Sequence, residues 1–257
     1  MTRWVVYRST SADFPNAVQD GIGFGTLDGD WVQPHQGDIF EAPVPTGQAL
    51  ALASLDLLSP VRPRQFIGLW NNFHAAAAKG GHAISDFPLY FLKASSSIIG
   101  PDGRIEAPAG YTGRLLYEGE LGIVIGPEQS IFGYTIVNDV TALDLLQLDP
   151  SFPQWARAKS AASFGPVGPC IVTDIDLNLA RVRVALNGRV RQDYPLSDMI
   201  FPPARIIERI GSELTLLPGD VIACGTSIGA LPMRPGMVVE VSIDGIGTLR
   251  NVVAGAE

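Results

Sequence analysis

Three carboxylates that could bind a metal ion lie in residues 115–144, within two apolar runs that we expect to form strands. Glu118 and Glu120 flank one glycine, and Asp139 lies in the second run. Because side chains alternate along a strand, both glutamates should share one face, whereas the opposite face carries Tyr117, Leu121, Ile123 and Ile125. Acids side by side in an apolar strand repel each other and are costly to bury unless a cation neutralises them.

The ligand chemistry of these acids favours a hard divalent cation. Carboxylate oxygens without a neighbouring cysteine or paired histidines suit Mg²⁺, Mn²⁺ or Ca²⁺ better than Zn²⁺. The alternative from spacing alone is an exposed strand edge at which both glutamates meet water, a common arrangement on half-solvated strands.

Two further residues lie where an apolar segment ends. His74 falls between a predicted buried strand, Phe66–Leu69, and a predicted helix, Ala75–Lys79, that two glycines terminate. From such a junction its imidazole could reach a cleft, or it could lie on the surface. Lys93 ends the predicted strand Phe87–Leu92 and is either a surface lysine or a cationic contact for an anionic substrate.

The run GTSIG, residues 225–229, matches the G-x-S-x-G pattern of serine hydrolases. In that fold the catalytic histidine follows the serine along the chain, and a helix follows the serine directly. Here all three histidines precede Ser227, and Gly229 and Pro232 disfavour a helix. We therefore reject a nucleophilic serine.

The elements that must position these residues are mostly strands. The run Val182–Leu186, the turn Asn187-Gly188 and the run Val190–Gln192 predict a hairpin. Helical spacing predicts a helix over Gly47–Leu58, with Thr46 as its cap, and Ile206–Leu217 shows both helical and strand patterns. The overall prediction is a mixed, β-rich α+β fold.

The proline-rich segment 59–64, SPVRPR, suits neither a helix interior nor a central strand and is the predicted domain boundary. It separates a small amino-terminal β domain, residues 1–60, from a larger domain, residues 61–257, that contains the three carboxylates. Short strands broken by turns, such as the turn at Asp28-Gly29, are expected before it.

Composition limits the possible partners. The chain has 257 residues, 46% apolar and 17% charged, with a net charge of −8, which predicts a globular protein that binds neither nucleic acid nor anionic membranes. Cys170 and Cys224 lie in apolar runs, which argues against a disulfide framework. With no evident export or anchoring segment, we expect a cytoplasmic protein with small-molecule or protein partners.

Seven motifs in their order along the chain resemble the fumarylacetoacetate hydrolase family: YEGELGIVIG, IFGYTIVNDVTALD, KSAASFGPVGP, NGRVRQ, SDMIF, LLPGDVIACGTSIG and GIGTLRN. The similarity covers about Pro60 to Val253. It implies a β-sandwich roll, usually a homodimer, that binds Mg²⁺, Mn²⁺ or Ca²⁺ beside an oxo-acid or diketone substrate.

The resemblance also implies roles for individual positions. Glu118, Glu120 and Asp139 match the metal ligands, and His74 falls at the position of the general base. Lys159 matches a lysine directed at substrate and metal. Thr226 matches a substrate-contacting threonine, and Gln192 a loop residue near the substrate.

The chain departs from the family pattern at four places. Ala77 stands where many relatives have a glutamate that assists the histidine, and Leu143 stands where an arginine is common. Trp70-Asn71 replaces the usual Asn-Tyr, and Ala161-Ala162 replaces Phe-Asp. The missing glutamate weakens a mechanism in which His74 alone activates water, and the missing arginine removes a bidentate partner for a carboxylate.

These implied roles predict metal-dependent hydrolysis of a C–C bond in a β-diketone or acylpyruvate-like substrate. A cation acting as a Lewis acid, together with Lys159, would stabilise an enolate. The alternatives are a 2-oxo acid isomerase or decarboxylase on the same site, a dehydratase or other lyase, and a metal-binding homologue that has lost catalysis.

Overall fold

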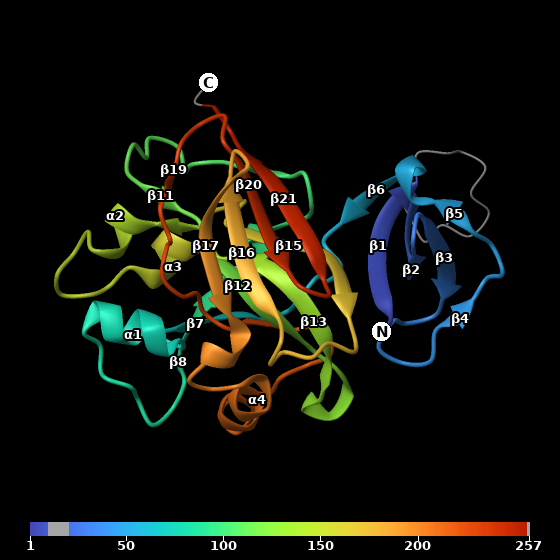
Figure 1. Ribbon diagram of the computed structural model, residues 1–257, viewed down its shortest axis with the longest axis horizontal. Helices are drawn as coiled ribbons and strands as arrows, with labels where there is room; N and C mark the ends of the chain where they lie inside the picture. Colours follow the sequence, from blue (N-terminus) through green and yellow to red (C-terminus); the bar gives the residue numbers. More distant parts are fainter. Residues whose placement is uncertain (10–20, 256–257) are drawn as a thin grey trace.

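Three β-sheets are the main regular structure of the computed structural model, which describes residues 1–9 and 21–255 (Figure 1). The largest sheet contains β1 (Arg3–Ser9), β2 (Ile22–Asp28), β3 (Trp31–Gln36), β4 (Val44–Pro45), β5 (Leu50–Ala51), β6 (Leu55–Leu58), β7 (Phe66–Trp70), β8 (Leu89–Lys93), β9 (Ile98–Ile99), β12 (Gly119–Ile125), β13 (Ile131–Asn138), β15 (Gly165–Val172) and β18 (Val221–Ala223). The second contains β10 (Arg104–Ile105), β16 (Arg181–Leu186), β17 (Arg189–Pro195), β20 (Val238–Ile243) and β21 (Gly247–Val253), and the third β11 (Leu115–Leu116), β14 (Thr141–Ala142) and β19 (Pro232–Met233). The predicted β-rich fold is confirmed.

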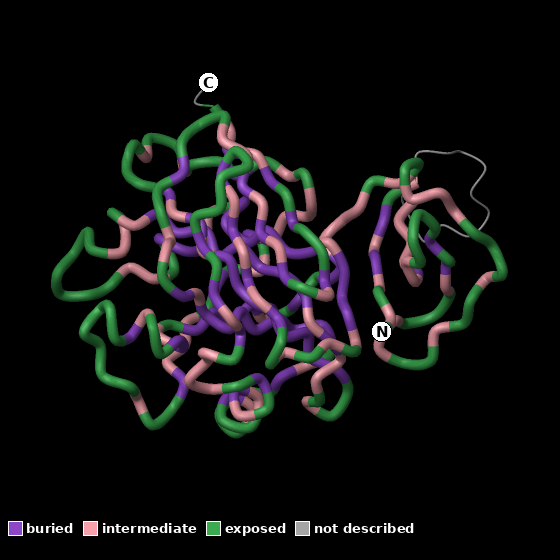
Figure 2. The backbone as a smooth tube through the Cα atoms, viewed as in Figure 1, coloured by how far each residue is buried: buried purple, intermediate pink, exposed green. Residues whose placement is uncertain are grey.

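The strand β12 lies at the centre of the large sheet, between β13 and β18, and all of its residues are buried (Figure 2). Leu121, Ile123 and Ile125 belong to the main apolar core together with Val184 of β16 and Val241 of β20. The second sheet therefore covers this face of β12, and the predicted separation of an apolar face from the glutamate-bearing face is confirmed.

The predicted hairpin is present as β16 and β17. Its two-residue turn places Asn187 at φ 47° and Gly188 at φ 74°, the left-handed conformations that a tight hairpin turn requires. The hairpin extends to Pro195, three residues further than the sequence pattern indicated.

The predicted helix over residues 47–58 is wrong. This segment forms β5, a 3₁₀ turn (Leu52–Ser54) and β6, which pairs antiparallel with β1 from Leu55 to Leu58. Thr46 Oγ1 accepts the N–H of Gln48 in a local turn instead of capping a helix. The apolar spacing fitted a helix, but pairing with a strand far away in the sequence decides the conformation.

Four α-helices occur in the described residues: α1 (His74–Gly80), α2 (Leu143–Leu146), α3 (Trp155–Lys159) and α4 (Pro203–Gly211). The helix α1 ends at Gly81, whose φ of 65° is left-handed, as the double glycine predicted. The ambiguous run 206–217 contributes its first residues to α4. None of these helices combines the length and apolar composition needed to cross a membrane.

The strands β1–β6 form the amino-terminal part at the right of Figure 1. The strand β1 pairs with β15 through Arg3 and Trp4, so the amino-terminal strands continue the large sheet beyond β15. Residues 10–20 of the predicted amino-terminal domain lie outside the described residues. The boundary at residues 59–64 stays a prediction.

Gly119 of the large sheet lies against Val184 and Val241 of the second sheet. A Cβ atom at this position would lie 2.4 Å from Val184 Cγ2 and 2.9 Å from Val241 Cγ1. Because valines in a packed core have little room to move, Gly119→Ala should lower the free energy of unfolding by about 1–3 kcal/mol. Urea denaturation measures this loss. Gly255→Ala is the control, since nothing lies within 4 Å of that Cβ position, and equal midpoints for both variants would contradict the packing argument.

Candidate metal centre and active site

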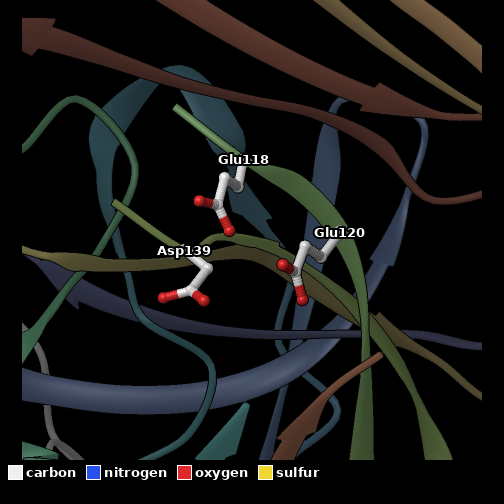
Figure 3. Close-up of side chains that lie close together, drawn as sticks. All are labelled: Glu118, Glu120 and Asp139. Atoms are coloured by element: carbon white, nitrogen blue, oxygen red, sulfur yellow. The ribbon is translucent and has the colours of Figure 1, made fainter. Parts of the chain in front are cut away.

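The three predicted metal ligands come together because β12 and β13 pair antiparallel. Gly119 pairs with Asn138 and Glu120 with Val137. Glu118, just before β12, therefore lies opposite Asp139, just after β13, and Glu120 lies two residues further along β12. The N–H of Asp139 donates to the carbonyl of Glu118 at 2.8 Å. One carboxylate oxygen from each acid lies within 4.8 Å of the other two, and Figure 3 shows the three groups gathered around one space.

These acids are not on an exposed edge. Glu120 and Asp139 are each 1% exposed, and the side chain of Glu118 is 17% exposed. The alternative in which both glutamates meet water is therefore wrong, because the segments that carry Thr141, Lys159 and Gly225 pack against the glutamate-bearing face of β12.

Two lysines neutralise Asp139. Lys159, from the last turn of α3, donates to Asp139 Oδ2 at 2.6 Å and to Glu118 Oε2 at 2.8 Å. Lys93, at the end of β8, donates to Asp139 Oδ1 at 2.6 Å, to the carbonyl of Phe164 at 3.0 Å and to the carbonyl of Lys159. These three acceptors use the three N–H groups of the buried Lys93 ammonium, so its charge is directed at the protein's own carboxylate.

The two lysines leave the carboxylates in unequal environments. Burial opposes the ionised form of Asp139, but the adjacent Lys159 and Lys93 hold the pKa of this carboxyl below its usual value. Burial, together with the nearby Asp139 and Glu118, raises the pKa of Glu120 well above its usual value. The cluster therefore lacks positive charge on the side of Glu120.

The donor set fits a hard divalent cation. Glu120 Oε2 accepts the N–H of Gly225 at 2.7 Å, but Glu120 Oε1 is buried without a hydrogen-bond partner among the described residues. Glu118 Oε1 accepts from the Thr141 hydroxyl at 2.8 Å. Three carboxylates face two ammonium groups, so one negative charge stays uncompensated when all five groups are ionised. A cation with oxygen ligands would satisfy both the charge and the orphaned oxygen.

Gln192 and Thr226, the other predicted substrate contacts, both contact the backbone of Gly119 and form a hydrogen bond with each other. Gln192 Nε2 donates to Thr226 Oγ1 at 3.0 Å, and Thr226 Oγ1 donates to the carbonyl of Gly119 at 3.0 Å. Tyr194, which our sequence analysis missed, donates its hydroxyl to the same carbonyl. The predicted strand ended at Gln192, and continuing its alternation by two residues is the signal that could have indicated Tyr194.

His74 is the first residue of α1 and is exposed. The preceding strand, β7, runs parallel to β18, so both strands end at the same edge, where Gly225 reaches Glu120. The buried Asn72 amide joins these ends, because its Nδ2 donates to the carbonyl of Cys224 at 2.8 Å. His74 thus starts from the correct edge of the sheet, but none of the hydrogen bonds and ion pairs described above for the carboxylate cluster involves its side chain.

Two of the departures from the family pattern have clear surroundings. Ala77 is buried on α1, at 2% exposed. Leu143 opens α2, and the next residue, Asp144, accepts two hydrogen bonds at 2.7 Å from Arg114, one from the backbone N–H and one from Nη2. These bonds lower the pKa of Asp144 to about 2. The guanidinium of Arg114 therefore lies beside this segment. It comes from the residue before β11 and not from position 143, where the family commonly has an arginine.

The fold and the site define a β-sheet protein with a buried, lysine-supported carboxylate centre suited to a divalent cation. Residues 65–254 match the family described as fumarylacetoacetate (FAA) hydrolase C-terminal, and residues 14–60 match the region described as Rv2993c-like, N-terminal. The chain belongs to the fumarylacetoacetate hydrolase family, as the seven motifs indicated.

Relatives share this similarity over nearly the whole chain. Protein Rv2993c of Mycobacterium tuberculosis is 39% identical over 92% of this chain and 96% of its own length. A crystal structure of 2-hydroxyhepta-2,4-diene-1,7-dioate isomerase from Mycobacterium marinum is 34% identical, with a TM-score of 0.86 over 99% of this chain and 98% of that one. Fumarylacetoacetate hydrolase from Exiguobacterium antarcticum is 29% identical, with a TM-score of 0.79 over the full length of both chains.

The burial of Lys93 predicts a large effect on stability. Lys93→Met keeps most of the side-chain length but removes the charge that faces Asp139, so the free energy of unfolding should fall by about 3–5 kcal/mol. Lys79→Met, at an exposed position of α1, is the control and should change it by less than about 0.5 kcal/mol. Urea denaturation monitored by circular dichroism measures both. A Lys93→Met protein as stable as the control would show that the ion pair contributes no net stabilisation.

Proposed function

We propose that this protein is a divalent-metal-dependent enzyme that hydrolyses a C–C bond in a β-diketone or acylpyruvate-like substrate. The observation that carries the proposal is the buried cluster of Glu118, Glu120 and Asp139, in which three acids face two lysines and one carboxylate oxygen has no hydrogen-bond partner among the described residues. Membership of a family that includes a fumarylacetoacetate hydrolase supports the reaction class. We propose Mg²⁺ as the resident ion, with Mn²⁺ and Ca²⁺ as the alternatives.

The charge of the loaded site favours an anionic substrate. A divalent cation would change the formal charge of the three acids and two lysines from −1 to +1, which attracts a carboxylate or an enolate. When bound, the cation supplies Lewis acidity toward a substrate carbonyl. An acylpyruvate, which carries a carboxylate beside its oxo group, fits this charge.

The proposed roles of the chain's own groups follow from their placement. Lys159 bridges Glu118 and Asp139 and would stabilise negative charge on the substrate, where burial strengthens the interaction. His74, exposed at the start of α1, would activate water or move a proton to a substrate carbon. Thr226 would contact substrate at the turn that follows β18. Lys93 would position Asp139, because its own N–H groups are all donated within the protein.

An isomerase on the same site is the second candidate. A named isomerase aligns over 99% of this chain at 34% identity, higher than the named hydrolase. Both reactions need an enolate stabilised by a cation and a group that moves a proton, and Ala77 leaves His74 without the glutamate that would help it activate water. Product analysis separates the two, because hydrolysis adds water and yields two fragments, whereas isomerisation changes no mass.

Glu120→Gln tests the metal centre. The amide keeps the size of the side chain but replaces one carboxylate of the ligand set, so Mn²⁺ affinity should fall by more than about tenfold and turnover of acylpyruvates should be lost. Isothermal titration calorimetry and mass spectrometry of the products measure these effects.

Glu106→Gln is the matched control, since Glu106 is exposed and lies outside the acid cluster. Full turnover in Glu120→Gln after chelation of metal would contradict the proposed function. Mn²⁺ binding by the native protein without turnover of any oxo acid or diketone would favour a homologue that has lost catalysis.

A further inference from the structure

The backbone of Gly119, between the two glutamate ligands, is held by side chains instead of by a neighbouring strand. Its N–H donates to Gln192 Oε1 at 3.3 Å. Its carbonyl accepts from the Thr226 hydroxyl at 3.0 Å and from the Tyr194 hydroxyl. We call Gln192, Tyr194 and Thr226 the Gly119 clamp.

This arrangement arises because β18 ends too early to pair with Gly119. Alternate residues of β12 direct their backbone groups toward β18, and this pairing continues as far as Leu121, whose carbonyl accepts the N–H of Cys224 at 2.8 Å. The next residue of that segment, Gly225, turns away with φ 88° and donates to Glu120 Oε2. The backbone groups of Gly119 would therefore lack partners without the clamp.

Two of the three clamp residues, Gln192 and Tyr194, lie on β17 of the second sheet. Gln192 and Tyr194 are two residues apart on this strand, so both point to the same face, and they are 1% and 5% exposed. The neighbouring Arg191 and Asp193 are exposed. The second sheet thus reaches across the interface to the residue between the two metal ligands.

The hydrogen bonds of Gln192 are directed into the protein. Its Oε1 accepts from Gly119, and its Nε2 donates to Thr226 Oγ1 and to the carbonyl of Ser227 at 3.2 Å. A buried amide with these partners holds the backbone rigidly, because each lost bond would leave a polar group unsatisfied.

We propose that Gln192 and Tyr194 are positioning residues that fix the separation of the Glu118 and Glu120 carboxylates. This inference rests on the proposed function, in which that pair binds a divalent cation. Rotation of the peptide units at Gly119 would turn the two glutamates relative to each other, and the clamp prevents it. Residues that orient metal ligands in this way typically change metal affinity by about 10–100-fold when they are removed.

The test compares two variants that each lose one buried tyrosine hydroxyl. Tyr194→Phe removes a bond to Gly119, whereas Tyr117→Phe removes the bond from Tyr117 to the carbonyl of Gly229, 2.7 Å long, and leaves the clamp intact. Electron paramagnetic resonance of Mn²⁺ titrated into each protein measures the affinity and records the spectrum of the bound ion. Tyr194→Phe should bind Mn²⁺ about tenfold or more weakly than Tyr117→Phe, with an altered bound-ion spectrum.

Each other outcome has a distinct meaning. Native protein that fails to bind Mn²⁺ overturns the proposed function and this inference with it. Native binding, together with equal affinities in the two phenylalanine variants, overturns the inference alone. If Tyr194→Phe does not fold, Gln192→Met replaces it, and unchanged Mn²⁺ affinity in that variant likewise overturns the inference.

Discussion

The structure depends on the ion pairs that Lys93 and Lys159 make with Asp139. A carboxylate that is 1% exposed is very unfavourable without a counter-charge, and here each of its oxygens accepts from one ammonium group at 2.6 Å. Lys93 also donates to the carbonyl of Lys159, the last residue of α3, and to the carbonyl of Phe164, which fixes the chain at the end of α3 and just after it. The same contacts therefore bury the acid and place the second lysine beside it.

The lysines compensate the charges of the three carboxylates unequally, and this inequality is the basis of the proposed cation binding. Both lysines contact Asp139, whereas the Glu120 carboxylate accepts a hydrogen bond from the N–H of Gly225 alone among the described residues. A protein that needed only stability would not gain from a buried carboxylate with a free oxygen, since apolar residues of similar volume would be at least as stable. The unsatisfied Glu120 is thus better explained by ligand binding than by folding.

The parts of the site that follow from local periodicity could be predicted from sequence. The alternation around Glu118 and Glu120 and the hairpin turn at Asn187-Gly188 required only neighbouring residues. The burial of Lys93 could not be predicted, because its partners Asp139 and Phe164 are distant in sequence and the same pattern fits a surface lysine. The helix predicted over residues 47–58 is wrong for the same reason, because pairing with the distant strand β1 overrides the helical spacing of this segment.

Gly119 connects the packing of the two sheets with the geometry of the proposed metal site. A side chain there would collide with Val184 and Val241, so the close approach of the two sheets requires a glycine at the centre of the ligand pair. Glycine, however, is the residue whose backbone is least restricted, which would leave the glutamates on either side poorly oriented. The hydrogen bonds from Gln192, Tyr194 and Thr226 remove that freedom. The sheet interface that demands the glycine thus also supplies, from β17, two of the side chains that hold it.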